Sequence, residues 1–364
     1  MIQPNFLLAI SLILLFSRLS LMAQPKTENV VLVTIDGMRW QELFQGADPE
    51  IISNKKYVKD AACLKATFWD IDPTIRRMKL FPFIWKTIAA KGQIYGNRML
   101  GNKVNVANRY WFSYPGYNEL LTGIPDRRIK NNARRNNPNE TILEFVNHQK
   151  SFQDKVAVFA SWDVFHYIIN QKRSGIHINA GNDTARAVKL SSREKYLNHL
   201  QQISPSPWSA TRFDEFTHQY AKEYFKKSFP KLLLIAYGET DEYAHNGHYD
   251  SYLEAANKTD SFLCDIWDWI QSDEKYRDKT TLIITTDHGR GGGRNSWRKH
   301  GIARPGSNHT WFMIMGPDTA ALGEVKDKQH YYNNQLAKTI AVFLNVEFPG
   351  NDNQGTIVAT AFEK

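Results

Sequence analysis

The sequence predicts an α/β fold in which a mostly parallel central sheet is sandwiched by helices. Stretches with apolar residues at helical spacing alternate with continuous apolar runs. A continuous apolar run is typical of a strand that is buried on both faces, and such strands occur in parallel sheets between layers of helices. Four of these runs supply the expected central strands, at residues 29–35, 231–237, 280–286 and 311–315.

Shorter segments complete the predicted order of elements. Further strands are expected at residues 93–99 and 155–160, and helices at residues 82–91, 141–149, 251–271 and 335–344. Residues 125–139 form a long polar loop rich in Arg and Asn, and long loops in compact domains often carry function. Residues 161–230 mix aromatic and polar residues. We interpret them as a cap of helices and loops, inserted into a single domain that spans residues 24–364.

The composition limits the classes of protein to which the chain can belong. A hydrophobic content of 42% is enough for a large core and excludes general disorder. The formal net charge of +9 suits an anionic substrate or surface. Basic residues are scattered apart from a cluster between Arg127 and Arg135, and no nucleic-acid-binding motif occurs. We therefore expect an anionic substrate as the partner, and we interpret the cluster as a solvated loop in preference to a nucleic-acid contact.

The N-terminal residues have the pattern of a secretory signal peptide. Residues 6–16 form an apolar run that is short for a membrane span, and Ala23 ends a small-residue cleavage site. We expect cleavage of residues 1–23, so that the mature protein is secreted or periplasmic and has no membrane span. An uncleaved anchor is the alternative, because no Lys or Arg precedes the apolar run. Cys63 and Cys264 lack metal-ligand spacing, and either a disulfide or two free thiols fits the sequence.

The stretch WFSYPGYNELLTG, residues 111–123, carries a candidate nucleophile. Pro115 and Gly116 favour a sharp turn after Ser113, and apolar residues then recur at helical spacing, so we expect a loop that leads into a helix. A hydroxyl there would lie near the N-terminus of the helix, where anions such as phosphate bind. Ser113 is therefore predicted to attack a phosphate or sulfate group, and a helix N-cap is the alternative role.

Acidic residues follow the predicted central strands, at the edge of the sheet where ligands of α/β proteins bind. A poorly solvated carboxylate at that edge needs a cationic partner. Carboxylates combined with imidazoles form the ligand set of a zinc-type hydrolytic site, and two ions held in this way leave positions for Ser113 and a phosphate oxygen. The candidate ligands are Asp36, Asp241, Asp287, His245, His288 and His300.

The order of these motifs resembles the alkaline phosphatase superfamily, in particular its nucleotide pyrophosphatase/phosphodiesterase branch. In that branch a strand ends in Asp-Gly, and a Thr or Ser stands two residues before a Pro and ahead of a Leu-x-Thr-Gly segment. An Asp-x-x-x-His, an Asp-His-Gly and a His-Gly then precede a strand that ends in Gly-Pro. The matching segments are VTIDG at 33–37, SYPGYNELLTG at 113–123, DEYAH at 241–245, TTDHG at 285–289, KHG at 299–301 and WFMIMGP at 311–317.

The resemblance, which covers about residues 29–318, implies two divalent cations and an asparagine that contacts phosphate. Zinc suits these ligands best, and manganese is the alternative. Asn132 is the best match for the asparagine, with Asn131 as the alternative, and His300 is preferred to His309 as a ligand because a Gly follows it. The implied ligands of one ion are Asp241, His245 and His300, and those of the other are Asp36, Asp287, His288 and the oxygen of Ser113.

The implied activity is hydrolysis of a phosphoric monoester or diester through a phosphoseryl intermediate on Ser113. The chain departs from the branch at Gly116, because Asn-His often follows the Pro there, and the segments that shape a nucleotide pocket have no clear counterpart. A monoester carries an extra charged oxygen, and the cations that could contact it are Arg109, Arg290 and Arg294.

Three other activities are alternatives. Sulfatases of the same superfamily carry an Arg four residues after a modified Ser or Cys, whereas this chain has Tyr117 at that position. A phosphotransferase or phosphomutase would use the same serine. A non-catalytic binding protein is disfavoured, because it would have no need for the complete set of six ligands.

Overall fold

Five parallel strands lie side by side at the centre of the structure, a computed structural model that describes residues 25–350 and 353–362. They adjoin in the order β7-β1-β6-β4-β5, and β9, β2 and β10 continue the sheet beyond β7. This arrangement confirms the predicted α/β fold with a mostly parallel sheet. The strands are β1 (Asn29–Ile35), β2 (Gln93–Tyr95), β4 (Val156–Ala160), β5 (His177–Ala180), β6 (Leu232–Tyr237), β7 (Thr280–Thr285), β9 (Phe312–Met315) and β10 (Gly323–Glu324).

The strand predicted at residues 311–315 is β9, and it runs antiparallel to both of its neighbours. The chain reaches it from β7 through loops and the short strand β8 (His309–Thr310), with no helix among these described residues. A parallel return would need a crossover, usually a helix, so the chain turns back beside β7 instead. Strand β8 pairs with β3 (Lys103–Asn105), which also pairs with β11 (His330–Tyr332), in a separate small sheet.

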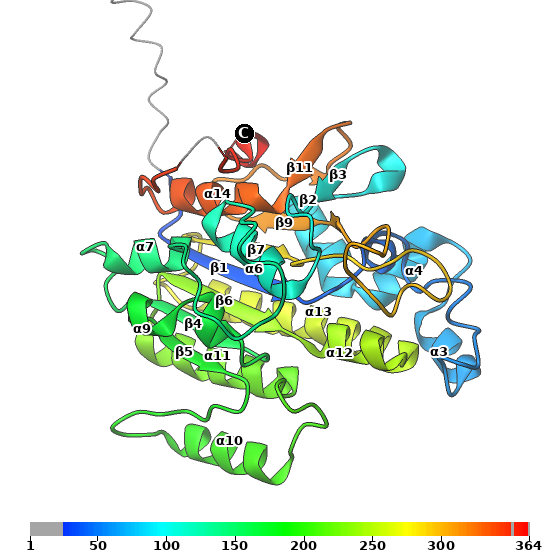
Figure 1. Cartoon of the computed structure of the whole chain (residues 1–364), viewed down its shortest axis with the longest axis horizontal. Helices are drawn as coiled ribbons and strands as arrows, with labels where there is room; N and C mark the ends of the chain where they lie inside the picture. The colour runs from blue at the N-terminus through cyan, green and yellow to red at the C-terminus, as the bar shows by residue number, and fades with distance from the viewer. Residues whose placement is uncertain (1–24, 351–352, 363–364) are drawn as a thin grey trace, which may run out of the picture.

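Helices cover both faces of the main sheet (Figure 1). One layer contains α2 (Trp40–Gln45), α3 (Ala61–Phe68), α4 (Pro73–Leu80), η1 (Ile84–Ile88), α5 (Ala89–Lys91), α11 (Asp214–Ser228), α12 (Glu239–Asn246) and α13 (Tyr249–Ser272). The other contains α6 (Ser113–Thr122), α7 (Ile142–His148), α8 (Phe165–Ile168) and α14 (Leu336–Phe343). The remaining helices are η2 (Arg98–Leu100), α9 (Gln171–Ser174), α10 (Ser192–Ile203), η3 (Asn333–Gln335) and η4 (Ala359–Phe362).

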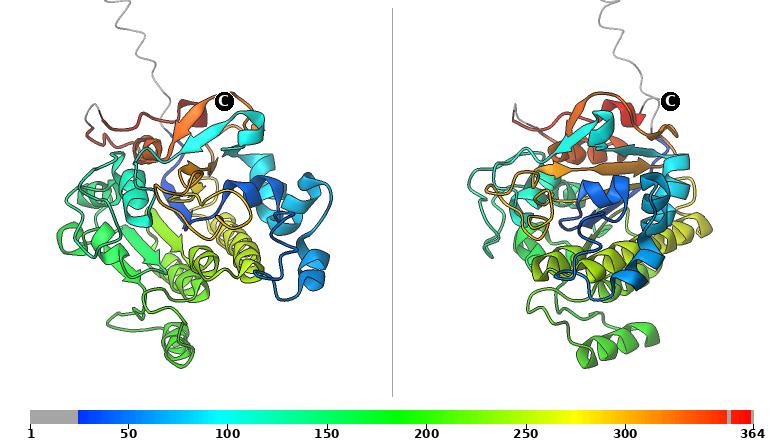
Figure 2. Two further views of the ribbon diagram at one scale, coloured as in Figure 1. Left: turned by 45° about the vertical axis from the view of Figure 1, so that its right-hand side comes forward. Right: turned by 90° about the vertical axis from the view of Figure 1, so that its right-hand side faces the viewer.

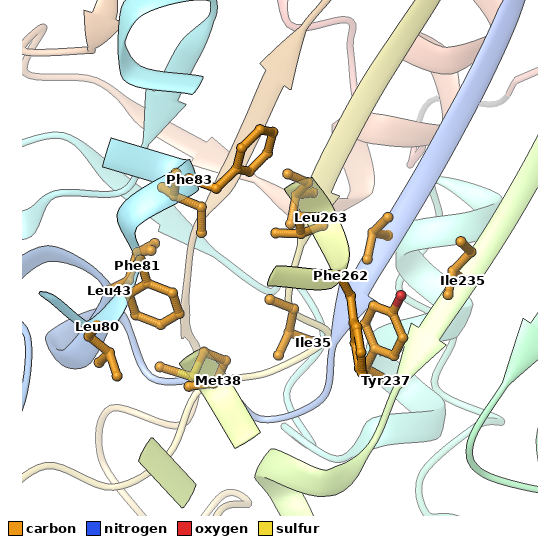
Figure 3. Packing of buried hydrophobic residues seen from close by; sticks show 14 of the residues in the cluster. Ile35, Met38, Leu43, Leu80, Phe81, Phe83, Ile235, Tyr237, Phe262 and Leu263 are labelled. Atoms are coloured by element: carbon orange, nitrogen blue, oxygen red, sulfur yellow. The ribbon is translucent and has the colours of Figure 1, made fainter. Parts of the chain in front are cut away.

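The hydrophobic core has two halves, one on each face of the sheet. Alternate residues of β1 point to opposite sides, so Val31 and Val33 belong to one cluster while Val30 and Leu32 belong to the other. Figure 3 shows part of the first cluster, where side chains from β1, β6 and α13 gather with those of the α2 and α4 region. Burial on both faces explains why continuous apolar runs marked the central strands.

Residues 161–230 contribute more than a cover to the fold. They supply the edge strand β5 and helix α11, and α10 projects from the body of the molecule (Figure 2). Strand β5 was not predicted because it is short and its apolar residues alternate with the polar residues His177 and Asn179. The expected role of this segment as a cap over the site stays a prediction.

The chain has a predicted signal peptide at its N-terminus and two cysteines. The predicted signal peptide, residues 1–23, lies outside the described residues. Within residues 25–350 and 353–362, no helix combines the length and the apolar character that a membrane crossing requires. Cys63 and Cys264 are both free thiols, so the disulfide alternative is not realised in the structure.

Candidate metal centre and nucleophile

The acidic residues predicted as ligands follow β1, β6 and β7 at one edge of the sheet. Asp36 directly follows the last residue of β1, and Asp287 lies two residues past β7. Asp241 lies in the first turn of α12, which begins immediately after β6 and Gly238. Because β1 pairs in parallel with both other strands, their carboxyl ends lie side by side and bring the three carboxylates together.

His288 lies at the centre of this group and is completely buried. Its Nε2 atom is 3.2 Å from Ser113 Oγ, 3.4 Å from Asp36 Oδ1 and 3.5 Å from Asp287 Oδ2. Ligand atoms around a tetrahedral zinc ion lie roughly 3.3 Å apart, as follows from bond lengths near 2.0 Å. The three distances from His288 Nε2 therefore match the spacing of ligands around one ion, and the ligand atoms of Asp36, Asp287 and His288 all lie within 4.8 Å of one another.

The carboxylates of this first cluster lack the partners that burial demands. Asp36 Oδ1 and Asp287 Oδ2 are buried and make no hydrogen bond within the described part of the chain. Burial, and then the charge of Asp241, raise the pKa of Asp36 well above its usual range. Burial and the charge of Asp36 do the same to the pKa of Asp287. Buried acidic oxygens without a hydrogen-bond donor fit a divalent cation, which would favour their ionised forms.

A second cluster lies beside the first and contains Asp241, His245 and His300. His245 Nε2 is 3.2 Å from Asp241 Oδ2 and 3.0 Å from His300 Nε2. His300 Nδ1 lies 3.0 Å from the carbonyl oxygen of Trp111, so Nδ1 donates there and Nε2 keeps its lone pair for the site. Burial and then the neighbouring His288 hold the pKa of His300 well below its usual range, which favours the neutral, metal-binding form.

Asp241 also contacts a cation of the protein itself, the guanidinium of Arg290. Burial raises the pKa of Asp241, but His245 and Arg290 outweigh burial and hold this pKa well below its usual range. Arg290 donates its other groups to the carbonyl oxygens of Trp297 and Arg298, at 2.8 and 2.7 Å. All nitrogens of Arg290 are thus engaged within the protein. Arg290 therefore positions Asp241, although the sequence had made it a candidate for contact with a substrate oxygen.

The nucleophile candidate is the first residue of α6, which corrects the predicted local structure. The helix begins at Ser113, so Pro115 and Gly116 lie in its first turns and not in a loop before it. Proline is tolerated there because the first N–H groups of a helix have no intrahelical acceptor. The N-cap is Phe112, which makes no side-chain cap, and Ser113 Oγ points to His288, so the alternative N-cap role is wrong.

The two asparagines proposed for phosphate contact behave differently. Asn132 Oδ1 accepts a hydrogen bond from the backbone N–H of Tyr114 at 3.0 Å, which places Asn132 at the N-terminus of α6. Asn131 instead accepts from Ala133 within its own loop. His309, the alternative ligand to His300, lies in β8 of the small sheet.

Residues that the sequence analysis did not single out hold the nucleophile in place. Trp111 has a φ of 55°, which is strained for a bulky residue. Asn108 Oδ1 accepts from the N–H groups of Tyr110 and Trp111, at 2.8 and 2.9 Å. Glu119 of α6 in turn accepts from the backbone of Asn108, and burial raises its pKa to about 7. No local pattern marks these residues, because their partners come from both sides of the turn.

Tyr117, the residue that distinguishes this chain from the sulfatase motif, also faces the site. Its hydroxyl lies 3.4 Å from Asp36 Oδ2 and 3.3 Å from Thr34 Oγ1, and its ring packs edge-on against Phe165. Tyr117 therefore donates to a candidate metal ligand from inside the protein.

Comparison with known proteins identifies the family. The model of the sulfatase family matches residues 115–346. This chain belongs to the sulfatase family. A search of the curated proteins found no match to this chain.

Solved structures share the fold of this sulfatase-family protein at low sequence identity. The wild-type alkaline phosphatase PafA has a TM-score of 0.60 at 10% identity, over 93% of this chain and 99% of that one. The phosphonate monoester hydrolase SpPMH from Silicibacter pomeroyi has a TM-score of 0.58 at 13% identity, over 92% and 76%. BT1596, a 2-O GAG sulfatase, has a TM-score of 0.55 at 11% identity, over 93% and 74%.

These findings confirm the resemblance to the alkaline phosphatase superfamily, whose members hydrolyse phosphoric and sulfuric esters with divalent metals. The narrower nucleotide pyrophosphatase/phosphodiesterase branch stays a prediction.

Proposed function

We propose that this protein hydrolyses phosphoric esters, with Ser113 as the nucleophile and two divalent cations, zinc in preference to manganese, as cofactors. One observation carries the proposal. Ser113 Oγ lies 3.2 Å from His288 Nε2, beside two buried carboxylate oxygens that have no hydrogen-bond partner among the described residues. The residues that would hold one ion are Asp241, His245 and His300, and those that would hold the other are Asp36, Asp287, His288 and Ser113.

Each residue then has a definite task. Bound cations would supply Lewis acidity, which lowers the pKa of a neighbouring hydroxyl and neutralises charge on phosphoryl oxygens. Ser113 Oγ gives up its proton to water and forms a bond to phosphorus, while the opposite phosphorus–oxygen bond breaks and the leaving alkoxide takes a proton from water. The amide oxygen of Asn132 is held by Tyr114, so the amide nitrogen is the atom available to donate to a phosphoryl oxygen. Water then attacks the phosphoseryl group and returns the proton to Ser113.

The test compares Ser113→Ala with wild type on an aryl phosphate, together with a count of bound metal. We expect the variant to lose most turnover, by a factor of about 100 or more, while it retains most of its metal, because the other ligands remain. Ser174→Ala is the matched control, since Ser174 is equally buried but lies in α9. Wild-type turnover in Ser113→Ala would remove the serine from the mechanism.

A second candidate activity is hydrolysis of sulfuric esters, which membership of the sulfatase family favours. The phosphoric ester is preferred because Tyr117 stands where sulfatases carry the arginine of their modification motif. A panel of aryl phosphate monoesters, diesters and sulfates, with mass spectrometry of the peptide that contains Ser113, separates the two. A phosphotransferase would instead pass the phosphoryl group to an added acceptor alcohol.

We also propose that the protein acts outside the cytoplasm, as a secreted or periplasmic enzyme. The apolar run at residues 6–16 and the small-residue site before Gln24 support this location. N-terminal sequencing of the protein from its native source should begin at Gln24. A chain that retains residues 1–23 would favour the uncleaved anchor.

A further inference from the structure

A loop rich in cations lies beside the nucleophile, and its cations have no role in the proposed chemistry. Residues 125–139 carry one acid, Asp126, and five cations: Arg127, Arg128, Lys130, Arg134 and Arg135. Two of the cations have acidic partners, since Arg128 pairs with Asp126 at 2.5 Å and Arg134 with Asp163 at 2.6 Å. No ion pair engages the other three within the described part of the chain.

The loop is fixed to the segment that carries Ser113. The hydroxyl of Tyr110 donates to the carbonyl oxygen of Arg127 at 3.0 Å, and that of Tyr114 donates to Arg135 at 2.7 Å. Tyr114 also gives its N–H to Asn132. At the far end of the loop, Asn137 is completely buried and donates to Asn118 of α6 at 3.2 Å. The backbone that carries the cations is therefore fastened to the segment that holds the nucleophile.

The loop and Tyr114 line an open cavity of about 410 Å³, a volume within the range of small-ligand sites. Tyr114, Ile129 and Pro138 give it apolar walls, whereas Arg128, Lys130 and Arg135 supply positive charge. Tyr114 directly follows Ser113, so the cavity lies alongside the start of α6. Arg128 is paired with Asp126, whereas Lys130 and Arg135 are unpaired in the part of the chain that the structure describes. An apolar surface combined with these two unpaired cations suits an organic group of about the size of a sugar that carries an anion.

We propose that residues 125–139 form a subsite for a second phosphoryl group of the substrate. This inference rests on the proposed function and makes the substrate a phosphodiester. An in-line displacement puts the leaving oxygen opposite Ser113 Oγ. We place the group that enters the cavity beside Tyr114 to the side of this line, so that it is the substituent that stays on the phosphorus. The substrate class is thus a phosphodiester whose retained substituent carries a further phosphate.

Two substrates that differ only in that phosphate test the proposal: the p-nitrophenyl ester of thymidine 5′-phosphate with and without a 3′-phosphate. We expect wild type to favour the 3′-phosphorylated ester by about tenfold in kcat/KM, from a few exposed ion pairs. The triple variant Arg127→Gln/Lys130→Gln/Arg135→Gln should lose most of this preference and keep its kcat/KM for the plain ester. High salt should also reduce the preference of wild type, because it screens exposed charges.

A second triple variant controls for the loss of net charge. Lys91→Gln/Lys150→Gln/Arg277→Gln removes three exposed cations that precede β2, β4 and β7, at the opposite end of the sheet. It should keep the preference for the 3′-phosphorylated ester. The proposal would be overturned if both triple variants lost the preference for the 3′-phosphorylated ester equally, or if wild type showed no such preference.

Binding measurements keep the outcome distinct from that of the proposed function. If wild type hydrolyses neither ester, the proposed function fails, and calorimetry with thymidine 3′,5′-bisphosphate and thymidine 5′-phosphate then decides the subsite. The subsite would be supported if wild type bound the bisphosphate more tightly than the monophosphate and the loop triple variant lost this difference. Equal binding of both nucleotides would refute it.

Discussion

Substitution of Gly37 by alanine is the sharpest test of the site geometry. Gly37 follows Asp36 at the end of β1 and has a φ of 59°, which costs an alanine roughly 1–2 kcal/mol. An added Cβ would also lie 2.6 Å from both Arg290 Nη1 and Asp241 Oδ1, and 3.1 Å from His288 Cε1. Ordinary contact begins near 3.4 Å, so Asp241 and Arg290 must each retreat by about 0.8 Å.

That displacement acts on a proposed ligand and on the group that positions it. We expect Gly37→Ala to weaken metal binding by about tenfold to 100-fold, as loss of a ligand-orienting contact does, and to lower kcat/KM for an aryl phosphate at least as much. Calorimetric titration of the metal-free protein with zinc measures the first effect, and urea unfolding measures the cost in stability.

Gly175→Ala provides the matched control. Gly175 has a φ of 65° at the end of α9, and an added Cβ would meet nothing within 4 Å. This variant should therefore show only the backbone strain, about 1–2 kcal/mol of unfolding free energy, with unchanged zinc affinity. Zinc binding by Gly37→Ala that equals wild type would refute the deduced crowding of Asp241.

Three further predictions follow from the structure. Dialysis against a chelator should abolish turnover and lower the unfolding temperature, and added zinc should restore both. Free zinc at 100 times its Kd should stabilise the fold by about 2.7 kcal/mol. Full turnover by the metal-free protein would contradict this prediction. Asn108→Ala should cost roughly 2–3 kcal/mol of stability and lower kcat/KM at least tenfold, because Asn108 holds the strained Trp111 before Ser113. Asn147→Ala, a buried asparagine before β4, should match the loss of stability without the loss of activity. Burial raises the pKa of Asp260 to about 7, although its carboxylate accepts hydrogen bonds from the backbone N–H groups of Phe83 and Ile84. The folded state therefore favours the neutral carboxyl group, and the stability that this provides is lost as the pH rises from about 4 to 7. Between pH 5 and pH 8 the unfolding free energy of wild type should therefore fall about 3 kcal/mol more than that of Asp260→Asn, and parallel curves would refute the assignment.

Strand positions were predictable because burial on both faces leaves a direct mark on the sequence. The runs at residues 29–35 and 280–286 coincide closely with β1 and β7. The same argument failed for β5, because an edge strand with His177 and Asn179 carries no continuous apolar run. The antiparallel course of β9 was also not predictable, since strand direction depends on the path of residues 286–311 and not on the strand itself.

The local structure around Ser113 shows a second limit of sequence reasoning. Pro115 and Gly116 are typical of a turn, yet both lie in α6. Gly116 is needed there because the helix packs directly against the carbonyl group of Asp287, where a Cβ would clash. A distant residue thus determines the role of the glycine, and local propensity gives no sign of it.

By itself, the sequence determined which side chains are candidates for the chemistry, because carboxylates and imidazoles that follow buried strands have few other uses. It also determined the layered α/β fold, through the apolar runs that such layers require. Only the tertiary structure decided which oxygens lack partners, that Arg290 is committed to Asp241, and that the loop at residues 125–139 is fastened beside Ser113. Those features depend on distances between atoms far apart in the chain, and such distances exist only once the strands have paired.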